Sequence, residues 1–345
     1  MRLAIVGFGG VGRALLKLIE DKKEDLIKSG LDLKVCYIVD IVGGVYDPNG
    51  INLDNLIQFL SVERDISLYP NFGSKDINFN TIITNNDIDL LVEMTPTNKE
   101  TGEPGMTHIK ESLLNGINVV TSNKGPILLA YEELSNIAFN NNVQLGIGCT
   151  TGGALPTINA GLFDMAGSNI LSIEGVLNGT TNFILADMEE NETTYEESLQ
   201  KAQKLGIAET NPTLDVGGWD TASKLLILTN VLMNQNKKLS DMSIEGITEI
   251  TPQDIKNAAA EGKKYKLVGK TQLNEDGVSM SVKLEKLDDS HSLYGVSGKN
   301  KAVKYTSDTL GDLTIIGGAS GLIPAAASVL RDVINIHKGY DFVKK

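Results

Sequence analysis

The sequence predicts two domains, the first an α/β domain built on a doubly wound parallel sheet and the second an α+β domain. The chain has 345 residues, and a typical domain takes roughly 100–200. Short apolar runs alternate with helical patterns up to about residue 150, which is typical of a parallel sheet. Beyond that point the strand-like stretches have polar neighbours, which indicates a different kind of sheet.

Composition excludes several classes of protein. Hydrophobic residues make up 41% and charged residues 22% of the chain, which argues against a disordered or collagen-like protein. The net charge of −13 argues against nucleic acid or an anionic membrane surface as the main partner. The two cysteines and three histidines are scattered, so neither a disulfide framework nor a zinc site is expected. Without a secretory signal or an 18-residue apolar run, we expect a cytoplasmic protein outside membranes.

The first domain begins with a buried strand at residues 3–6 and a helix over 11–20, whose charged tail reaches residue 28. A second apolar run at 33–39 ends at Asp40. Further buried strands are expected at 90–94, 118–121 and 143–147, with helices at 106–115 and 131–140. The polar stretch 49–86 is interpreted as loops and short helices at the edge of this domain.

The second domain is less regular. Strands are expected at 173–176 and 278–284, and helices at 195–205 and 222–234. A final helix over 325–336 follows the glycine-rich loop 317–321. The chain has no low-complexity linker, so we expect the two domains to pack closely.

A glycine fingerprint lies between the first strand and the first helix. It has the form G-x-G-x-x-G, and its residues are Gly7, Phe8, Gly9, Gly10, Val11 and Gly12. The first glycine allows a tight turn, the second lets the backbone approach a pyrophosphate, and the third lets helix and strand pack closely. The helix N-terminus then offers free N–H groups to phosphates. This context predicts a dinucleotide site; the alternative is a glycine-rich turn without a ligand.

Asp40 ends the second strand, where a carboxylate accepts hydrogen bonds from the adenosine ribose hydroxyls and repels a 2′-phosphate. No Arg or Lys follows within residues 41–49. The sequence therefore favours NAD over NADP. The alternative is an aspartate that only caps a turn.

Two further segments carry chemistry. Lys124 follows the strand at 118–121 and sits where open parallel sheets bind ligands, although a surface lysine in a turn would look the same. Asp220 and Lys224 are four residues apart, so they share one face of a helix, and Asp220 lies near its N-terminus. Glu209 and Asp215 precede them in the same loop. The alternative is a capped helix with a solvated ion pair.

Several ordered motifs together resemble the homoserine dehydrogenase family. They are the fingerprint, the Val-Val-Thr-Ser-Asn-Lys run at 119–124, and the segments 151–156, 178–185, 206–224 and 317–330. The resemblance covers nearly the whole chain. It implies a short monofunctional form without an ACT domain or a fused aspartate kinase.

The resemblance also implies an architecture and a reaction. Residues 1–147 and 310–345 would form a Rossmann NAD(P)-binding domain, and 148–309 a substrate-binding and dimerisation domain. The expected reaction interconverts L-homoserine and L-aspartate 4-semialdehyde by hydride transfer, in threonine and methionine biosynthesis. The expected assembly is a homodimer.

Site residues follow from the same resemblance. Lys124, Asp220 and Lys224 match catalytic positions, and which lysine transfers the proton stays open. The expected substrate-binding residues are Glu209, Asp215, Asn178, Gly179 and Thr180. Beside the fingerprint and Asp40, the expected cofactor-binding residues are Met94, Thr95, Pro96, Ser122, Asn123, Lys124 and Gly321. A monovalent cation could bind backbone carbonyls of Gly148, Thr151 and Gly153.

Two rival interpretations remain at this stage. One is another amino-acid dehydrogenase of the same architecture, which need not keep the spacing from Glu209 to Lys224. The other is an NAD-binding sensor without turnover, which has no use for the two lysines.

Overall fold

The computed structural model describes residues 1–343 and divides into two compact units. The first unit comprises Met1–Ala154 and Gly321–Lys345, of which residues 344 and 345 lie outside the described part, and the second comprises Leu155–Ser320. The boundaries expected at 147/148 and 309/310 therefore fall at 154/155 and 320/321. Residues 312–317 belong to the second unit because they pair with a strand of its sheet. Residues 149–152 belong to the first because they pack against its last helix.

The first unit contains a seven-stranded sheet with the strand order β4-β3-β2-β1-β5-β6-β7. Its strands are β1 (Arg2–Val6), β2 (Lys34–Asp40), β3 (Gly43–Tyr46), β4 (Gly73–Ser74), β5 (Leu90–Glu93), β6 (Asn118–Thr121) and β7 (Leu145–Gly146). From β2 through β7 neighbouring strands run parallel, whereas β3 and β4 are antiparallel additions at one edge. The doubly wound parallel sheet expected from the sequence is confirmed.

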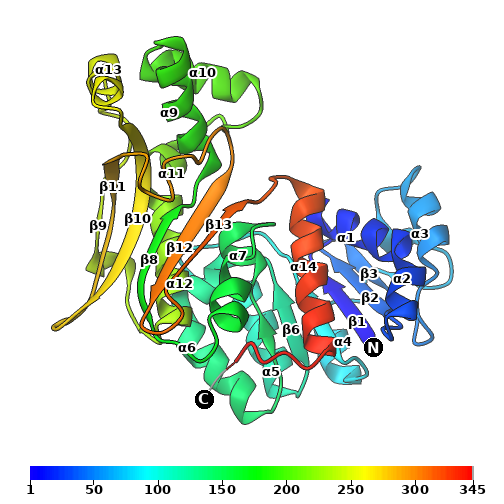
Figure 1. Cartoon of the computed structure of the whole chain (residues 1–345). Coiled ribbons are helices and arrows are strands. Elements are labelled where there is room, and N and C mark those ends of the chain that lie inside the picture. Colours follow the sequence, from blue (N-terminus) through cyan, green and yellow to red (C-terminus); the bar gives the residue numbers. More distant parts are fainter. Residues whose placement is uncertain (344–345) are drawn as a thin grey trace. The chain divides into compact units, whose positions relative to one another are not determined.

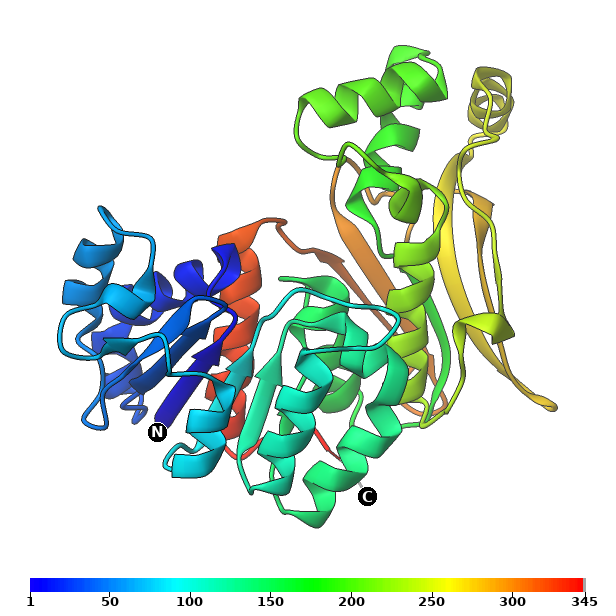
Figure 2. The same ribbon diagram turned by 180° about the vertical axis from the view of Figure 1, so that it is seen from behind.

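Helices cover both faces of this sheet (Figures 1 and 2). The last helix of the chain, α14, lies beside α1 on one face, and α5 and α6 lie together on the other. The helices are α1 (Gly10–Asp21), α2 (Lys23–Lys28), α3 (Leu53–Leu60), α4 (Phe79–Asn85), α5 (Gly105–Leu114), α6 (Lys124–Asn140), α7 (Cys149–Gly152) and α14 (Leu322–His337), with the 3-10 turn η1 (Ile66–Leu68). Because both faces are covered, β1 and β5 are apolar and buried along most of their length.

Two local features differ from the expectation. Strand β3 was not anticipated, because its Gly-Gly-Val-Tyr sequence lacks an apolar run and follows β2 after only two residues. Helix α6 begins at Lys124 rather than residue 131, and a non-helical residue, Ala130 (φ −146°, ψ 30°), breaks it in the middle. The sequence periodicity located only the part after this break.

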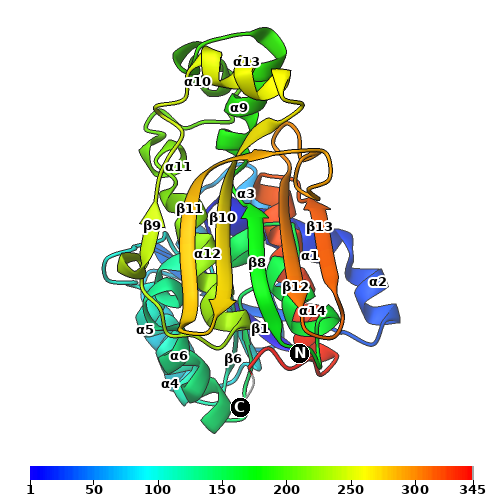
Figure 3. The same ribbon diagram turned by 60° about the vertical axis from the view of Figure 1, so that its left-hand side comes forward.

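The second unit contains a six-stranded sheet with the order β13-β12-β8-β10-β11-β9, which Figure 3 shows face on. All neighbouring strands are antiparallel except β9 and β11. The strands are β8 (Ile170–Val176), β9 (Met242–Ile244), β10 (Lys264–Asn274), β11 (Gly277–Leu287), β12 (Lys301–Ser307) and β13 (Asp312–Gly317). This mixed unit confirms the expected α+β character, although β9, β10, β12 and β13 were not located from the sequence.

One face of this sheet packs against the long helix α12 (Trp219–Leu232). The helices α9 (Gly179–Asn191), α10 (Tyr195–Lys204) and α13 (Pro252–Ala260) gather at one end of the sheet (Figure 3). Shorter elements are α8 (Thr157–Asn159), η2 (Ala160–Asp164), α11 (Thr213–Val216) and η3 (Leu239–Asp241). Helix α9 was not predicted, because buried residues occur around much of its circumference and leave no clear apolar stripe.

Candidate active site

The carboxyl ends of the central parallel strands meet at one edge of the first sheet. Backbone hydrogen bonds join them in sequence: Gly7 N to Val39 O at 3.0 Å, Met94 N to Val6 O at 2.8 Å, and Ser122 N to Glu93 O at 3.2 Å. The segments after β2, β1, β5 and β6 therefore lie side by side. Open sheets bind ligands at such an edge.

The glycines of the fingerprint are required for two different reasons. Gly7 has φ +92°, and a Cβ there would lie 2.5 Å from the carbonyl carbon of Met94. A Cβ at Gly12 would lie 2.7 Å from the Gly7 oxygen. Gly9, which caps α1, has nothing within 4 Å of the Cβ position. Packing thus demands the outer glycines, whereas Gly9 leaves open space in front of a helix N-terminus, which fits a pyrophosphate.

The other fingerprint residues support this turn. The Phe8 side chain is buried beneath the Arg13 guanidinium, 4.9 Å from its ring centroid, so Phe8 offers only its backbone to a ligand. Val11 is half-buried. A Cβ at Gly10 would lie 2.9 Å from the Leu322 side chain, so the start of α14, capped by Gly321, lies against the fingerprint helix.

Asp40 is the last residue of β2 and is half-buried, and its Oδ1 accepts a hydrogen bond from Ile41 N at 2.9 Å. The fold also brings a second arginine residue to the first turns of α1. Arg13, in α1, donates to the backbone oxygen of Arg64 at 3.4 Å. Arg64 lies outside residues 41–49, the stretch after Asp40 that holds no Arg or Lys, and was not predicted from the sequence.

Lys124 is half-buried and is the first residue of α6. Its neighbour Asn123 caps that helix by accepting a hydrogen bond from Gly125 N at 3.1 Å. Asn123 is itself anchored, because its N–H donates to Thr121 Oγ1 at 2.9 Å.

A buried carboxylate lies behind these loops. Glu93 is fully buried and accepts hydrogen bonds from Thr95 N at 2.9 Å and from Thr121 Oγ1 at 3.0 Å. It therefore ties the segment 94–96 to the segment 122–124, with Pro96 left exposed. Glu93 was not predicted as a site residue, although an acidic residue that ends the buried apolar run Leu-Leu-Val is a signal in the sequence.

The second unit brings together four of the predicted residues. Asn178 donates through Nδ2 to Asp215 Oδ1 at 2.7 Å and to Asp220 Oδ2 at 2.9 Å. Lys224 Nζ lies 2.6 Å from the same Asp220 oxygen and donates to Leu177 O at 2.8 Å. Two acidic groups, one amide and one ammonium thus form a single network.

Helix α12 creates the geometry of the ion pair. It begins at Trp219, so Asp220 lies in its first turn, where the helix dipole stabilises a carboxylate. Lys224 follows one turn later on the same face, as predicted. The two side chains are only 12% and 13% exposed, so this pair is not a solvated surface bridge.

The other predicted substrate residues are placed less uniformly. Thr180 Oγ1 donates to Ile207 O at 3.1 Å and so anchors the loop that carries Glu209. Glu209 itself is exposed, and its carboxylate makes no hydrogen bond or ion pair within residues 1–343. Gly179 begins α9, and a Cβ there would lie 2.9 Å from Lys299 O.

The segment predicted to hold a cation lies in the first unit. Gly148 N donates to the buried carboxylate of Asp332 at 2.7 Å, Thr151 is buried within α7, and Gly153 has φ +62°. Among residues 1–343, no group of three His, Cys, Asp or Glu side chains could hold a metal ion. A cation here would therefore depend on backbone oxygens, and this site stays a prediction. No helix within the described part of the chain is long and apolar enough to cross a membrane.

Comparisons with known proteins point in one direction. The homoserine dehydrogenase family model matches residues 156–334. A homoserine dehydrogenase of Methanocaldococcus jannaschii is 38% identical over 98% of both chains. An NAD(+)-dependent homoserine dehydrogenase of Pseudomonas canavaninivorans is 35% identical over 98% of this chain and 96% of its own. A mutant hyperthermophilic archaeal homoserine dehydrogenase in complex with NADPH superposes with a TM-score of 0.83 at 27% identity, covering 99% of both chains.

Proposed function

The chain belongs to the homoserine dehydrogenase family, and from that premise we propose how its residues divide the work of the reaction. The enzyme catalyses the NAD(P)-dependent interconversion of L-homoserine and L-aspartate 4-semialdehyde. Oxidation of the alcohol removes a hydride and a proton. The protein must therefore bind a zwitterionic amino acid, hold the cofactor, and stabilise charge on the reacting oxygen.

We assign binding of the cofactor to the first unit. The turn 7–12 and the start of α1 would hold its pyrophosphate, Asp40 its adenosine ribose, and the segments 94–96 and 122–124 its nicotinamide half. The open space at Gly9 supports this assignment. When bound, the nicotinamide supplies the hydride acceptor. Asp40 favours NAD over NADP, because its charge repels a 2′-phosphate.

We assign binding of the amino-acid substrate to the second unit. Asp215 and Glu209 would bind the substrate ammonium, and Asn178 would orient Asp215 and Asp220. Asp220 holds Lys224 in place through their 2.6 Å contact. The observation that carries this proposal is the Asn178–Asp215–Asp220–Lys224 network, because a protein that only bound a nucleotide would have no use for it.

Lys124 and Lys224 serve the reacting oxygen in this proposal. An ammonium stabilises negative charge on oxygen, and a neutral amine accepts the hydroxyl proton. Either lysine can fill the second role. The pH dependence of kcat in Lys124→Met and Lys224→Met distinguishes them, because loss of the proton acceptor removes the corresponding limb of the profile.

The experiment follows reduced nicotinamide formed from L-homoserine, with NAD and NADP in parallel. Lys224→Ala should lower kcat by about 10²–10⁴-fold while the KM for the cofactor stays near the wild-type value. Lys256→Met, which changes an exposed lysine of α13 in the same unit, should leave kcat unchanged. Wild-type kcat in Lys224→Ala would overturn the role given to this residue.

We further propose that the enzyme is a cytoplasmic homodimer that pairs through the second unit. Family membership supports this assembly, as does edge strand β13, which leaves Ile316 52% exposed. Light scattering coupled to size exclusion measures the mass directly. A mass of 37.1 kDa, that of one chain, would exclude the dimer.

A further inference from the structure

Lys266 is a buried lysine that the reaction does not use. It lies on β10 and is only 3% exposed. Its Nζ donates to two neutral acceptors, Asn182 Oδ1 at 3.0 Å and Val296 O at 2.5 Å. Burying an ammonium without a carboxylate in contact costs free energy, so its presence suggests a local role.

Asn182 extends the contact into a network. Its Nδ2 donates to Gly298 O at 2.8 Å and to Asn300 O at 3.4 Å. Lys266 and Asn182 together therefore hold three carbonyls of one short stretch of chain, residues 296–300. We refer to this stretch as the 296–300 segment.

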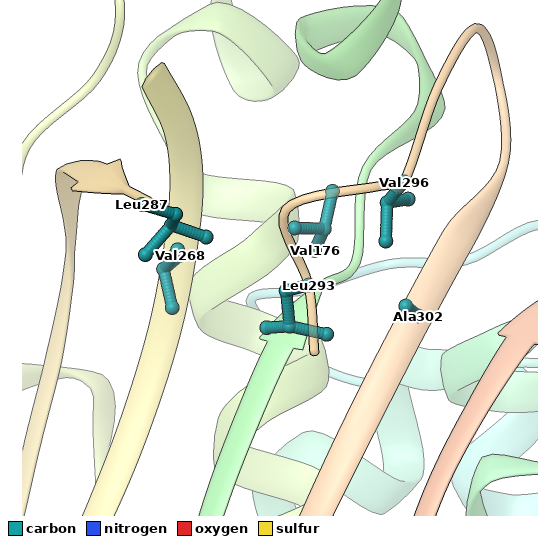
Figure 4. Packing of buried hydrophobic residues seen from close by; sticks show 6 residues of the cluster. All are labelled: Val176, Val268, Leu287, Leu293, Val296 and Ala302. Atoms are coloured by element: carbon teal, nitrogen blue, oxygen red, sulfur yellow. The ribbon is translucent and has the colours of Figure 1, made fainter. Parts of the chain in front are cut away.

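Apolar packing holds the start of this segment to the sheet. Val296 and Leu293 lie in a buried cluster with four side chains of the sheet region, Val176, Val268, Leu287 and Ala302 (Figure 4). The apolar side chains anchor residues 293–296, whereas the polar pair fixes the backbone that follows. The 296–300 segment is thus held by apolar packing at its start and by the hydrogen bonds of Lys266 and Asn182 along its length.

The 296–300 segment in turn lies against the start of α9, next to Asn178. A Cβ at Gly179 would lie 2.9 Å from Lys299 O, so the segment lies directly against the first turn of α9. Gly179 follows Asn178, whose amide binds Asp215 and Asp220. Asn178 is the N-cap of α9, and the backbone N–H of Asn182 donates to its backbone oxygen at 3.3 Å, so the two residues are joined across the first turn of the helix.

We propose that Lys266 and Asn182 are positioning residues that set the place of Asn178 and thereby the affinity of the enzyme for its amino-acid substrate. Neither residue need touch substrate or cofactor. The inference rests on the proposed function, in which Asn178 orients the carboxylates of the substrate site. It assigns work to the second unit alone, so it predicts an effect on one substrate and not on the other.

The test compares the KM for L-homoserine with the KM for the cofactor in two variants. Lys266→Met removes the donors and keeps the length of the side chain. Asn182→Asp keeps the shape and the acceptor for Lys266 but removes the donors to Gly298 and Asn300. In both, the KM for L-homoserine should rise roughly tenfold or more, because small displacements of positioning groups have large kinetic effects. The KM for the cofactor should stay within about twofold of the wild-type value.

Controls separate positioning from general damage. Lys256→Met should leave both constants unchanged, since that side chain is exposed on α13. General damage would reduce the active fraction, and so kcat, without raising one KM selectively. If Lys266→Met does not fold, Asn182→Asp decides the matter, because it is isosteric and gains an attractive contact with Lys266.

The outcomes also separate this inference from the proposed function. Asn178→Ser keeps a helix cap but loses the amide bonds to Asp215 and Asp220. If Asn178→Ser raises the KM for L-homoserine and a folded Lys266→Met or Asn182→Asp does not, the positioning role is wrong and the substrate site stands. If Asn178→Ser leaves that KM unchanged, the proposed substrate site is wrong. Equal rises in both KM values for Lys266→Met would also overturn the positioning role.

Discussion

The two units build their sites from different parts of the chain. The first unit uses backbone: Gly7, Gly9 and Gly12 lie within six consecutive residues and shape a turn in front of a helix N-terminus. The second uses side chains from separate elements, joined by hydrogen bonds between Asn178 and Asp220, 42 positions apart. The first site should therefore be sensitive to any added Cβ, and the second to the loss of a polar group.

The sheets of the two units also differ in where they carry polar groups. Strands β1 and β5 are buried along most of their length, because helices cover both faces. In the second unit burial alternates along β11, and charged residues such as Glu174 and Lys270 pair across neighbouring strands. A covered parallel sheet leaves its strand ends as the place for polar contacts, whereas the antiparallel sheet carries polar groups along its length.

Alanine substitutions in the glycine turn of the first unit should have the largest effects. Gly7→Ala places a methyl group 2.5 Å from Met94 C at φ +92°, so we expect it to cost about 1–3 kcal/mol for the strained backbone alone and to abolish cofactor binding. Gly9→Ala meets no atom within 4 Å and should keep its unfolding free energy within about 0.5 kcal/mol of wild type. It should still bind NAD more weakly, because the methyl fills the space for the pyrophosphate.

Thermal unfolding with and without NAD measures both effects. If Gly9→Ala binds NAD with wild-type affinity, the proposal that this turn binds the pyrophosphate is wrong.

The next prediction concerns the stability of the second unit and its buried lysine, Lys266. Burial lowers the pKa of Lys266 to about 8, with help from Lys264, while Glu189 and Glu190 act in the opposite direction. A lysine with a lowered pKa penalises the folded state below pH 8, and this penalty fades as the pH rises from about 8 toward 10.5. The unfolding free energy of wild type should therefore gain on that of Lys266→Met by up to an order of 3 kcal/mol over this interval. Urea unfolding at a series of pH values measures the difference, and parallel curves would contradict the lowered pKa.

The smallest effect concerns the choice between NAD and NADP in the first unit. Asp40→Ser should raise the KM for NAD about tenfold, because a hydrogen bond from a ribose hydroxyl to a charged group is lost. The KM for NADP should fall. Arg64→Ala, at the contact with Arg13, should weaken NADP use and leave NAD unchanged. The ratio of kcat/KM for the two cofactors measures this preference, and an unchanged ratio in Asp40→Ser would show that Asp40 only caps a turn.

Local features of the fold could be predicted. The fingerprint, the strand ending at Asp40 and the shared face of Asp220 and Lys224 are confirmed as structural features. Helix α9 and the break at Ala130 were not predicted, because the first is buried on many sides and the second follows no local signal. The roles assigned to the site residues remain proposals.

Within the candidate site, too, some features could be predicted from the sequence and others could not. Spacing alone placed Lys224 one helical turn after Asp220, and glycine spacing between a predicted strand and a predicted helix located the turn at 7–12. The contacts of Glu93, Asn182 and Lys266 could not be predicted in this way, because each joins segments that are distant in sequence or depends on burial.

Short-range sterics and periodicity follow from neighbouring residues, so the parallel strands of the first unit and the glycine turn at 7–12 could be predicted from the sequence. Which carboxylates share a hydrogen-bond donor, which lysine loses its solvent, and which residue contacts Arg13 of α1 depended on long-range packing. Burial and charge proximity are properties of the assembled chain: they arise only when segments such as 178–182, 220–224 and 296–300 are brought together.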